Sequence, residues 1–200
     1  MRAIRGRRRA GRAFVLSSPS GGGKTTVINA LVRRLRGVTR SVSVTTRAAR
    51  PGERQGRDYV FLSAAAFLRL RRHRALLEWA QVHGAAYGTP RGPVADALAD
   101  GRDVLLSLDV QGARAVRRAL GGKAVLIFLL PPSLERLRER LRHRRTDSAA
   151  AIRRRLVAAR REMACAAWYD HVVVNERLAD TVARVLAIIR AERKRATKGR

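Results

Sequence analysis

A glycine-rich segment near the N-terminus carries the clearest chemical signal in this chain. Residues 18–25 read Ser-Pro-Ser-Gly-Gly-Gly-Lys-Thr, between an apolar run at 13–17 and a segment of helical periodicity at 25–36. Glycines let backbone N–H groups turn toward a phosphate chain, and the following helix adds the positive end of its dipole. Lys24 would reach the β- and γ-phosphates of a nucleoside triphosphate, and the Thr25 hydroxyl would ligate magnesium. The sequence therefore predicts a phosphate-binding loop.

This segment departs from the usual phosphate-loop pattern once, because Ser18 stands where the first glycine is expected. The alternative is a glycine-rich turn beside a surface lysine. The chain has 40 arginines but only four lysines, and one of the four is Lys24. A lysine at this particular position is therefore evidence against that alternative. We expect the triphosphate site to comprise Ser18, Pro19, Ser20, Gly21, Gly22, Gly23, Lys24, Thr25 and Thr26.

The segments around the loop indicate an α/β fold. Continuous apolar runs recur at 104–108 and 124–130, with a shorter one at 172–174, and each is followed by a helix-like segment. Runs that are apolar at every position are typical of strands buried on both faces, and their alternation with helices favours a parallel sheet. We expect a core of about five parallel strands with flanking helices.

Two regions differ from this core. Residues 41–46 alternate polar and apolar side chains, 58–62 and 77–82 are further strand-like segments, and a helix is expected over 64–74, which indicates an inserted mixed α+β subdomain. Residues 133–168 favour a basic helical hairpin with a break near 144–148.

The net charge of +29, from 44 basic and 15 acidic residues, would ordinarily suggest a nucleic-acid partner. A GC-rich coding bias would produce the same excess of arginine and alanine, and 4% aromatic residues are too few for base-stacking platforms. We therefore expect no dedicated nucleic-acid target and only non-specific affinity for polyanions.

Composition also excludes other classes of protein. With 46% hydrophobic residues in 200, the chain can bury a core, but no apolar stretch approaches the ~18 residues of a membrane span. The basic segment 1–12 lacks the apolar part of a secretory signal, so we expect it to be a disordered extension of a cytoplasmic protein. A single Cys165 cannot form an internal disulfide, nor a structural zinc site with four scattered histidines.

Spaced motifs along nearly the whole chain resemble those of the guanylate kinases. The segment 41–53, which ends Arg-Ala-Ala-Arg-Pro-Gly-Glu, is similar to the nucleotide-binding segment of that family. The further matches, in order, are Gly56, Asp58-Tyr59, Phe61, Glu78-Trp79-Ala80, Tyr87-Gly88-Thr89, Asp109-Val110-Gln111-Gly112, Pro131-Pro132-Ser133, Arg140-Leu141, Arg144, Arg155-Leu156 and Val174-Asn175. Several motifs in one order are far more specific than any one of them.

The resemblance implies a P-loop NTPase core with a parallel sheet, a GMP-binding insert at 43–91 and a helical lid at 135–160. The core would then comprise 13–42, 92–134 and the segment from 161 to the C-terminus. It also implies that ATP and magnesium are used to phosphorylate GMP, and dGMP, by in-line transfer.

The resemblance further implies the residues that bind GMP. Its phosphate would be held by Arg47, Arg50, Tyr59 and Tyr87. Guanine presents two adjacent donors and one acceptor, a demand that Glu78, Ser43 and Thr89 meet, whereas adenine would leave the carboxylate unpaired.

Two of these residues have an alternative explanation. Glu78 also fits an ordinary acid on a strand surface. Thr89, followed by Pro90, is also typical of a helix N-cap with proline at the first helical position, and both roles can hold together.

On the ATP side, the resemblance implies that Arg140, Arg144 and Arg155 are lid arginines, catalytic together with Lys24 and Arg47. It also implies that Asn175 lies near the adenine.

Asp109 ends a buried run, where a carboxylate can orient magnesium or contact GMP, with Thr25 as the other metal ligand. The family has a second acid two residues earlier, where this chain has Ser107, and it has glycines beside Arg144 where this chain has His143 and Arg145.

Three other functions remain open. A P-loop kinase of a sugar phosphate would not need Glu78 and Thr89 together. A non-catalytic module of the guanylate kinase type typically lacks a working phosphate loop, which this chain keeps. A nucleic-acid binder would keep its affinity when Lys24 is replaced and would lose it steeply as the salt concentration rises.

Overall fold

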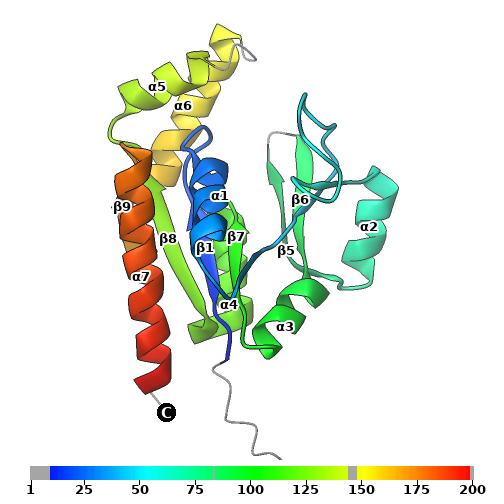
Figure 1. The fold of residues 1–200 in the computed structure, drawn as a ribbon. Coiled ribbons are helices and arrows are strands. Elements are labelled where there is room, and N and C mark those ends of the chain that lie inside the picture. Colours follow the sequence, from blue (N-terminus) through cyan, green and yellow to red (C-terminus); the bar gives the residue numbers. More distant parts are fainter. Residues whose placement is uncertain (1–9, 83, 144–147, 199–200) are drawn as a thin grey trace, which may run out of the picture. The chain divides into compact units, whose positions relative to one another are not determined.

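The computed structural model describes residues 10–82, 84–143 and 148–198 (Figure 1). These residues divide into two compact units. The first unit contains the described residues up to Ala13, Gly37–Leu106 and Gln111–Ala124. The second contains Phe14–Arg36, Ser107–Val110 and the described residues from Val125 onward.

A five-stranded sheet has the strand order β2-β7-β1-β8-β9. Its strands are β1 (Ala13–Ser17), β2 (Val38–Arg40), β7 (Asp103–Ser107), β8 (Ala124–Leu130) and β9 (His171–Val174). The β2–β7 and β8–β9 pairs are parallel. Every residue of β1 is buried, as its continuous apolar run predicts. The expected α/β core is therefore confirmed, although β2 is too short and too polar to be recognised from the sequence.

The described residues of the second unit contain four helices. They are α1 (Lys24–Arg34), α5 (Leu134–His143), α6 (Ala149–Ala164) and α7 (Leu178–Lys198), and a 3₁₀ turn, η2 (Cys165–Trp168), follows α6. Of these helices, α1, α5 and α7 each follow a strand of this sheet. The helices α1 and α7 pack side by side (Figure 1). Leu137 and Leu141 of α5 pack against Ile152 and Ala159 of α6, so α5 and α6 form the expected helical hairpin.

The first unit carries a second sheet of four strands in the order β4-β3-β6-β5. Its elements are β3 (Val44–Thr45), β4 (Val60–Phe61), α2 (Ala64–Arg72), β5 (Leu76–Val82) and β6 (Ala85–Pro90). The strand β6 is antiparallel to both β3 and β5. A cluster of Val44, Phe67, Leu76 and Ala86 forms the core of this sheet and α2. The remaining helices of the unit are α3 (Arg91–Ala99), α4 (Val110–Leu120) and η1 (Gly121–Lys123).

The strand β6 was not expected, because Gly88 and Pro90 are poor strand residues. Glycine is favoured at position 88, since a Cβ atom there would crowd Leu76 Cδ1 at 2.9 Å and the Glu78 carbonyl oxygen at 3.2 Å. The strand also corrects the alternative role of Thr89. The N-cap of α3 is Pro90, without a side-chain hydrogen bond, and Thr89 belongs to β6.

The expected boundary of the disordered segment, at residue 12, lies too far along the chain. Residues 1–9 lie outside the described residues, but Gly11 is buried and its N–H donates to the Leu98 carbonyl oxygen. The Arg12 N–H donates to Asp103 Oδ1 at 2.8 Å. The ordered chain therefore begins before residue 13, because this segment is hydrogen-bonded to the start of β7.

Within the described residues, no helix is long and apolar enough to cross a membrane.

Candidate nucleotide-binding site

The phosphate loop of the second unit joins the end of β1 to the start of α1, as the sequence predicts. Gly21 and Gly23 have φ angles of 90° and 89°, in the left-handed region that favours glycine. Gly23 is the N-cap of α1 and has no side chain to cap it, so the first N–H groups of the helix are left for an anion.

Lys24 and Ser18 shape this loop from within. Lys24 Nζ donates to the Ser18 carbonyl oxygen at 2.6 Å and approaches Ser18 Oγ at 3.3 Å. The Ser18 side chain is buried, and a Cβ atom at Gly22 would lie 2.5 Å from its Oγ. Serine therefore fits at this position, where the usual pattern has glycine, because the loop keeps a glycine opposite to it.

Asn175 lies against the phosphate loop. Its Nδ2 donates to the Gly22 carbonyl oxygen at 2.6 Å, and its Oδ1 accepts from Thr181 Oγ1 at 3.0 Å. A Cβ atom at Gly23 would meet the same amide at 2.8 Å. Asn175 therefore holds the backbone of the loop. The sequence analysis expected this residue near the adenine and did not predict this contact.

The structure describes two of the three arginines expected in the lid. Arg140 on α5 donates to the Asn175 carbonyl oxygen at 2.9 Å, which joins the hairpin to the end of β9. Arg155 lies on α6, and Arg144 lies outside the described residues. The helix α6 begins at Ala149, and its N-cap is Ser148, whose Oγ accepts from the Ala151 N–H close to the expected break.

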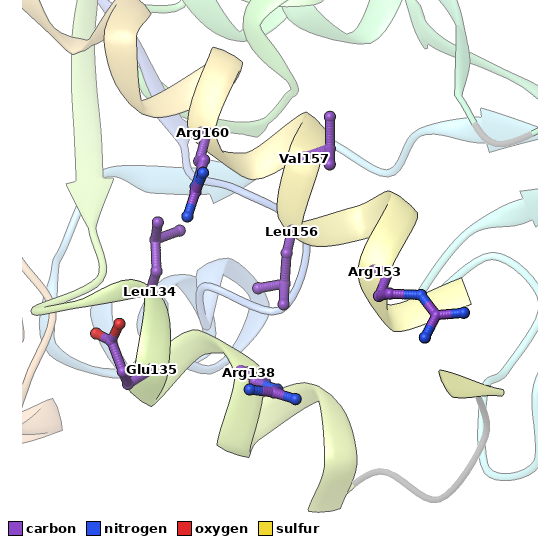
Figure 2. Close-up of a pocket in the computed structure, with 7 residues that line it drawn as sticks. All are labelled: Leu134, Glu135, Arg138, Arg153, Leu156, Val157 and Arg160. Atoms are coloured by element: carbon purple, nitrogen blue, oxygen red, sulfur yellow. The ribbon is translucent and has the colours of Figure 1, made fainter. Parts of the chain in front are cut away.

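A cavity of about 330 Å³ lies between α5 and α6, and Figure 2 shows the side chains that line it. The described residues that line it are Leu134, Glu135, Arg138, Arg153, Leu156, Val157 and Arg160. Because none of these is among the residues expected to bind nucleotide, we assign the cavity no part in the transfer.

A carboxylate that the sequence analysis did not single out lies near Lys24 and Asp109. Burial raises the pKa of Glu162 on α6, the charge of Lys24 lowers it and the charge of Asp109 raises it further, with a net upward shift. The only signal in the sequence is that Glu162 is the single acid of α6, a helix with five arginines.

Thr25 and Asp109 offer a hydroxyl and a carboxylate oxygen, the hard donors that Mg²⁺ prefers, so the donor set fits this ion. Thr25 lies in the first turn of α1, and Asp109 follows β7 directly after Leu108. Among the described residues, no group of three or more His, Cys, Asp and Glu could hold a metal ion.

In the first unit, three of the expected phosphate ligands come together at the second sheet. Arg47 Nε donates to the Tyr87 hydroxyl at 3.1 Å, and the guanidinium lies 5.3 Å from the centre of the Tyr59 ring. The Tyr59 and Tyr87 rings meet edge to face with centroids 5.9 Å apart. Their position follows from register, because Thr45 pairs with Tyr87 and the chain turns from β3 directly to Arg47.

The expected guanine-binding pair is also formed. Glu78 on β5 is paired with Thr89 on β6, and Thr89 Oγ1 donates to Glu78 Oε1 at 2.6 Å. Glu78 is only 6% exposed and Thr89 is fully buried, so the alternative of a surface acid is wrong. Tyr87 and Thr89 are two residues apart on one strand, so their side chains lie on the same face, about 7 Å apart along it.

The other expected GMP ligands are less constrained. Arg50 is exposed, and the contact of its backbone N–H is with Glu53 Oε2, at 2.8 Å. Ser43 is half-buried directly before β3, and its carbonyl oxygen accepts from the Val60 N–H. Glu53, which the motif contained without a role, is a direct partner of Arg47.

A family model described as Guanylate kinase matches residues 10–192. This chain belongs to the guanylate kinase family. It is 47% identical over 182 residues to Guanylate kinase of Dechloromonas aromatica (strain RCB), covering 91% of this chain and 90% of that relative. It is 47% identical over 185 residues to Guanylate kinase of Rhodopseudomonas palustris (strain BisB18), covering 92% and 84%.

A solved structure of the family has the same fold. The crystal structure of guanylate kinase from Anaplasma phagocytophilum matches with a TM-score of 0.79 and 39% identity, covering 92% of this chain and 87% of that one. The resemblance seen in the motifs and the expected P-loop fold are thus confirmed, and the match from residue 10 agrees with the ordered Gly11 and Arg12.

Proposed function

We propose that this member of the guanylate kinase family transfers the γ-phosphoryl group of ATP to GMP, forming ADP and GDP. The observation that carries the proposal is the buried pair of Glu78 and Thr89. The carboxylate offers acceptors, and guanine presents two adjacent donors on one edge that match them. A sugar-phosphate acceptor offers no such edge, and no observation favours a nucleic-acid or scaffolding role.

The acceptor site selects guanine through the charge of the Glu78 carboxylate and through the β5–β6 register that places Thr89 beside it. Glu78 accepts from guanine N1–H and N2–H₂ while Thr89 fixes the carboxylate through Oε1. Ser43 supplies a hydroxyl near the base. No residue is assigned to the 2′-hydroxyl, so dGMP is a second substrate.

The phosphate end of the acceptor site combines hydroxyl and guanidinium donors. Tyr87 receives a hydrogen bond from Arg47, and its own O–H remains as a donor to the phosphate. Arg50 and Tyr59 complete the set. These donors orient one phosphate oxygen for in-line attack, so no covalent intermediate with the protein is needed.

On the donor side, the N–H groups around Gly21 and Gly23 and the start of α1 hold the phosphates of ATP. Lys24 leaves the Ser18 carbonyl oxygen to meet the β- and γ-phosphates. Arg140, Arg144 and Arg155 of the lid neutralise charge as the phosphoryl group moves.

Thr25 and Asp109 would hold magnesium together with the phosphates of ATP, and the ion would supply charge neutralisation at the transferring group. We place the reaction in the cytoplasm.

A coupled assay of ADP formation with GMP, dGMP, AMP, CMP and UMP tests the proposal. We expect rapid turnover with GMP and dGMP alone. ADP formation that depends on ribose 5-phosphate rather than on GMP, or on no acceptor nucleotide, would refute it.

A further inference from the structure

The guanidinium of Arg47 is held almost entirely by the chain itself. Nη1 donates to Glu53 Oε2 at 2.9 Å and to the Ala48 carbonyl oxygen at 2.6 Å, and Nη2 donates to Glu53 Oε1 at 2.9 Å. Nε donates to the Tyr87 hydroxyl. An arginine has five N–H groups, so these four bonds leave at most one for a nucleotide phosphate. Arg47 thus reaches a phosphate mainly through its neighbours.

Glu53 joins this arginine to the next expected phosphate ligand. Its Oε2 also accepts from the Arg50 N–H at 2.8 Å, and its own N–H donates to the Arg50 carbonyl oxygen at 3.0 Å. Gly52, with a φ angle of 82°, makes the turn between them. One carboxylate therefore sets the side chain of Arg47 and the backbone of Arg50.

We propose that Glu53 is a positioning residue for the GMP phosphate, which it serves by locking Arg47 so that Nε orients the Tyr87 hydroxyl as a phosphate donor. The inference rests on the proposed function. A bidentate carboxylate fixes the plane of a guanidinium, whereas a single bond lets it rotate. With Nε fixed toward Tyr87, the hydroxyl accepts from Arg47 and its proton turns to the phosphate.

Because Glu53 is charged, it could either strengthen or weaken the binding of GMP. Burial raises the pKa of this carboxyl, but hydrogen bonds from Arg47 and Arg50 outweigh burial and lower the pKa, so Glu53 is ionised at neutral pH. A carboxylate beside a phosphate site also repels the phosphate. If Glu53 positions Arg47, removal of its charge weakens GMP binding. If Glu53 mainly repels the phosphate, removal of its charge strengthens GMP binding.

Asp58 provides a matched control in the same segment. Its Oδ2 accepts from the Arg54 N–H at 2.9 Å and pairs with the Arg57 guanidinium at 2.8 Å. It is therefore another ionised carboxylate that closes a turn of this segment through a side chain and a backbone N–H, with the pKa likewise lowered by these bonds. Both of these contacts of the Asp58 carboxylate lie within this turn, and neither is with Arg47.

The experiment compares Glu53→Gln and Asp58→Asn with the wild-type chain in steady-state kinetics. We expect Glu53→Gln to raise the KM for GMP about tenfold, with kcat and the KM for ATP within about twofold, since one charge-assisted bond to Arg47 is lost. The inhibition constant of guanosine, which has no phosphate, should not change. Asp58→Asn should behave as wild type.

A double-mutant cycle tests whether Glu53 acts through Tyr87. Tyr87→Phe removes the hydroxyl without touching Glu53, and it should raise the KM for GMP by itself. If Glu53 works by orienting that hydroxyl, Glu53→Gln adds little to Tyr87→Phe, whereas independent effects multiply.

Three results would overturn the inference. An unchanged KM for GMP in Glu53→Gln means that the carboxylate does not position the phosphate ligands, and a lower KM means that it competes with the phosphate. An equal rise in Asp58→Asn, or a weaker affinity for guanosine, means that the segment is merely distorted. Multiplying effects in the cycle mean that Glu53 does not act through Tyr87. A wild-type chain without GMP-dependent ADP formation instead refutes the proposed function itself.

Discussion

The buried pair of Glu78 and Thr89 makes Glu78→Gln the sharpest test of how this chain recognises its acceptor. The amide is isosteric with the carboxylate and can still accept the 2.6 Å bond from Thr89 Oγ1 through its oxygen. Its NH₂ group is then directed toward the donor edge of guanine, where the carboxylate offered an acceptor. The change therefore alters base recognition while it leaves the β5–β6 pairing in place.

The magnitude follows from the burial of the site. A hydrogen bond to a charged group contributes about 1.5 to 3 kcal/mol, and Glu78 is only 6% exposed, so water cannot replace the lost acceptor. Since 1.4 kcal/mol corresponds to a tenfold change, kcat/KM for GMP should fall about 10-fold to 100-fold. Selectivity for GMP over AMP should fall too, because an amide can pair with adenine.

The assay is coupled ADP formation at saturating ATP with varied GMP and AMP. The KM for ATP and the melting temperature should stay near wild type, and Gln81→Ala, an exposed change on the same strand, should leave GMP kinetics unaltered. If kcat/KM for GMP is unchanged in Glu78→Gln, Glu78 does not contact the base and the proposed acceptor site is wrong.

Other predictions follow from the contacts of the phosphate loop, the N-terminal segment and β7. Asn175→Asp replaces the amide donor that holds the loop by a carboxylate, and it should raise the KM for ATP about tenfold with a smaller change for GMP, as measured in the same assay. Deletion of residues 1–9 should leave kcat near wild type and weaken DNA binding at low salt, and a large loss of activity would contradict this. Gly11→Ala should instead lower the melting temperature, at a cost of about 1 to 3 kcal/mol, because its Cβ would lie 2.0 Å from the Arg102 carbonyl oxygen; an unchanged melting curve would show that this segment is dispensable. Ser107→Asp should lower the magnesium concentration for half-maximal rate more than it changes kcat at saturating metal, and superimposable titrations would place this residue outside the shell of the ion.

The sequence by itself determined the local elements and the glycine-rich loop between β1 and α1. The buried strands β1 and β8 follow from continuous apolar runs, and α1 from helical periodicity after three glycines. These features depend on neighbours within one element, which local patterns encode. The order of spaced motifs also indicated the family, and it suggested the residues that we propose for the acceptor site, Glu78 and Arg47 among them.

Only the tertiary structure decided which of these residues meet and through which atoms. The strand β6 includes Gly88, a poor strand residue, because residues of β5 occupy the space that a side chain at this position would need. Glu53 holds Arg47 through a turn, and Asn175 holds Gly22 from 153 residues away. Such contacts are set by sheet register and by the path of the chain, and periodicity within a single segment carries no information about either of them.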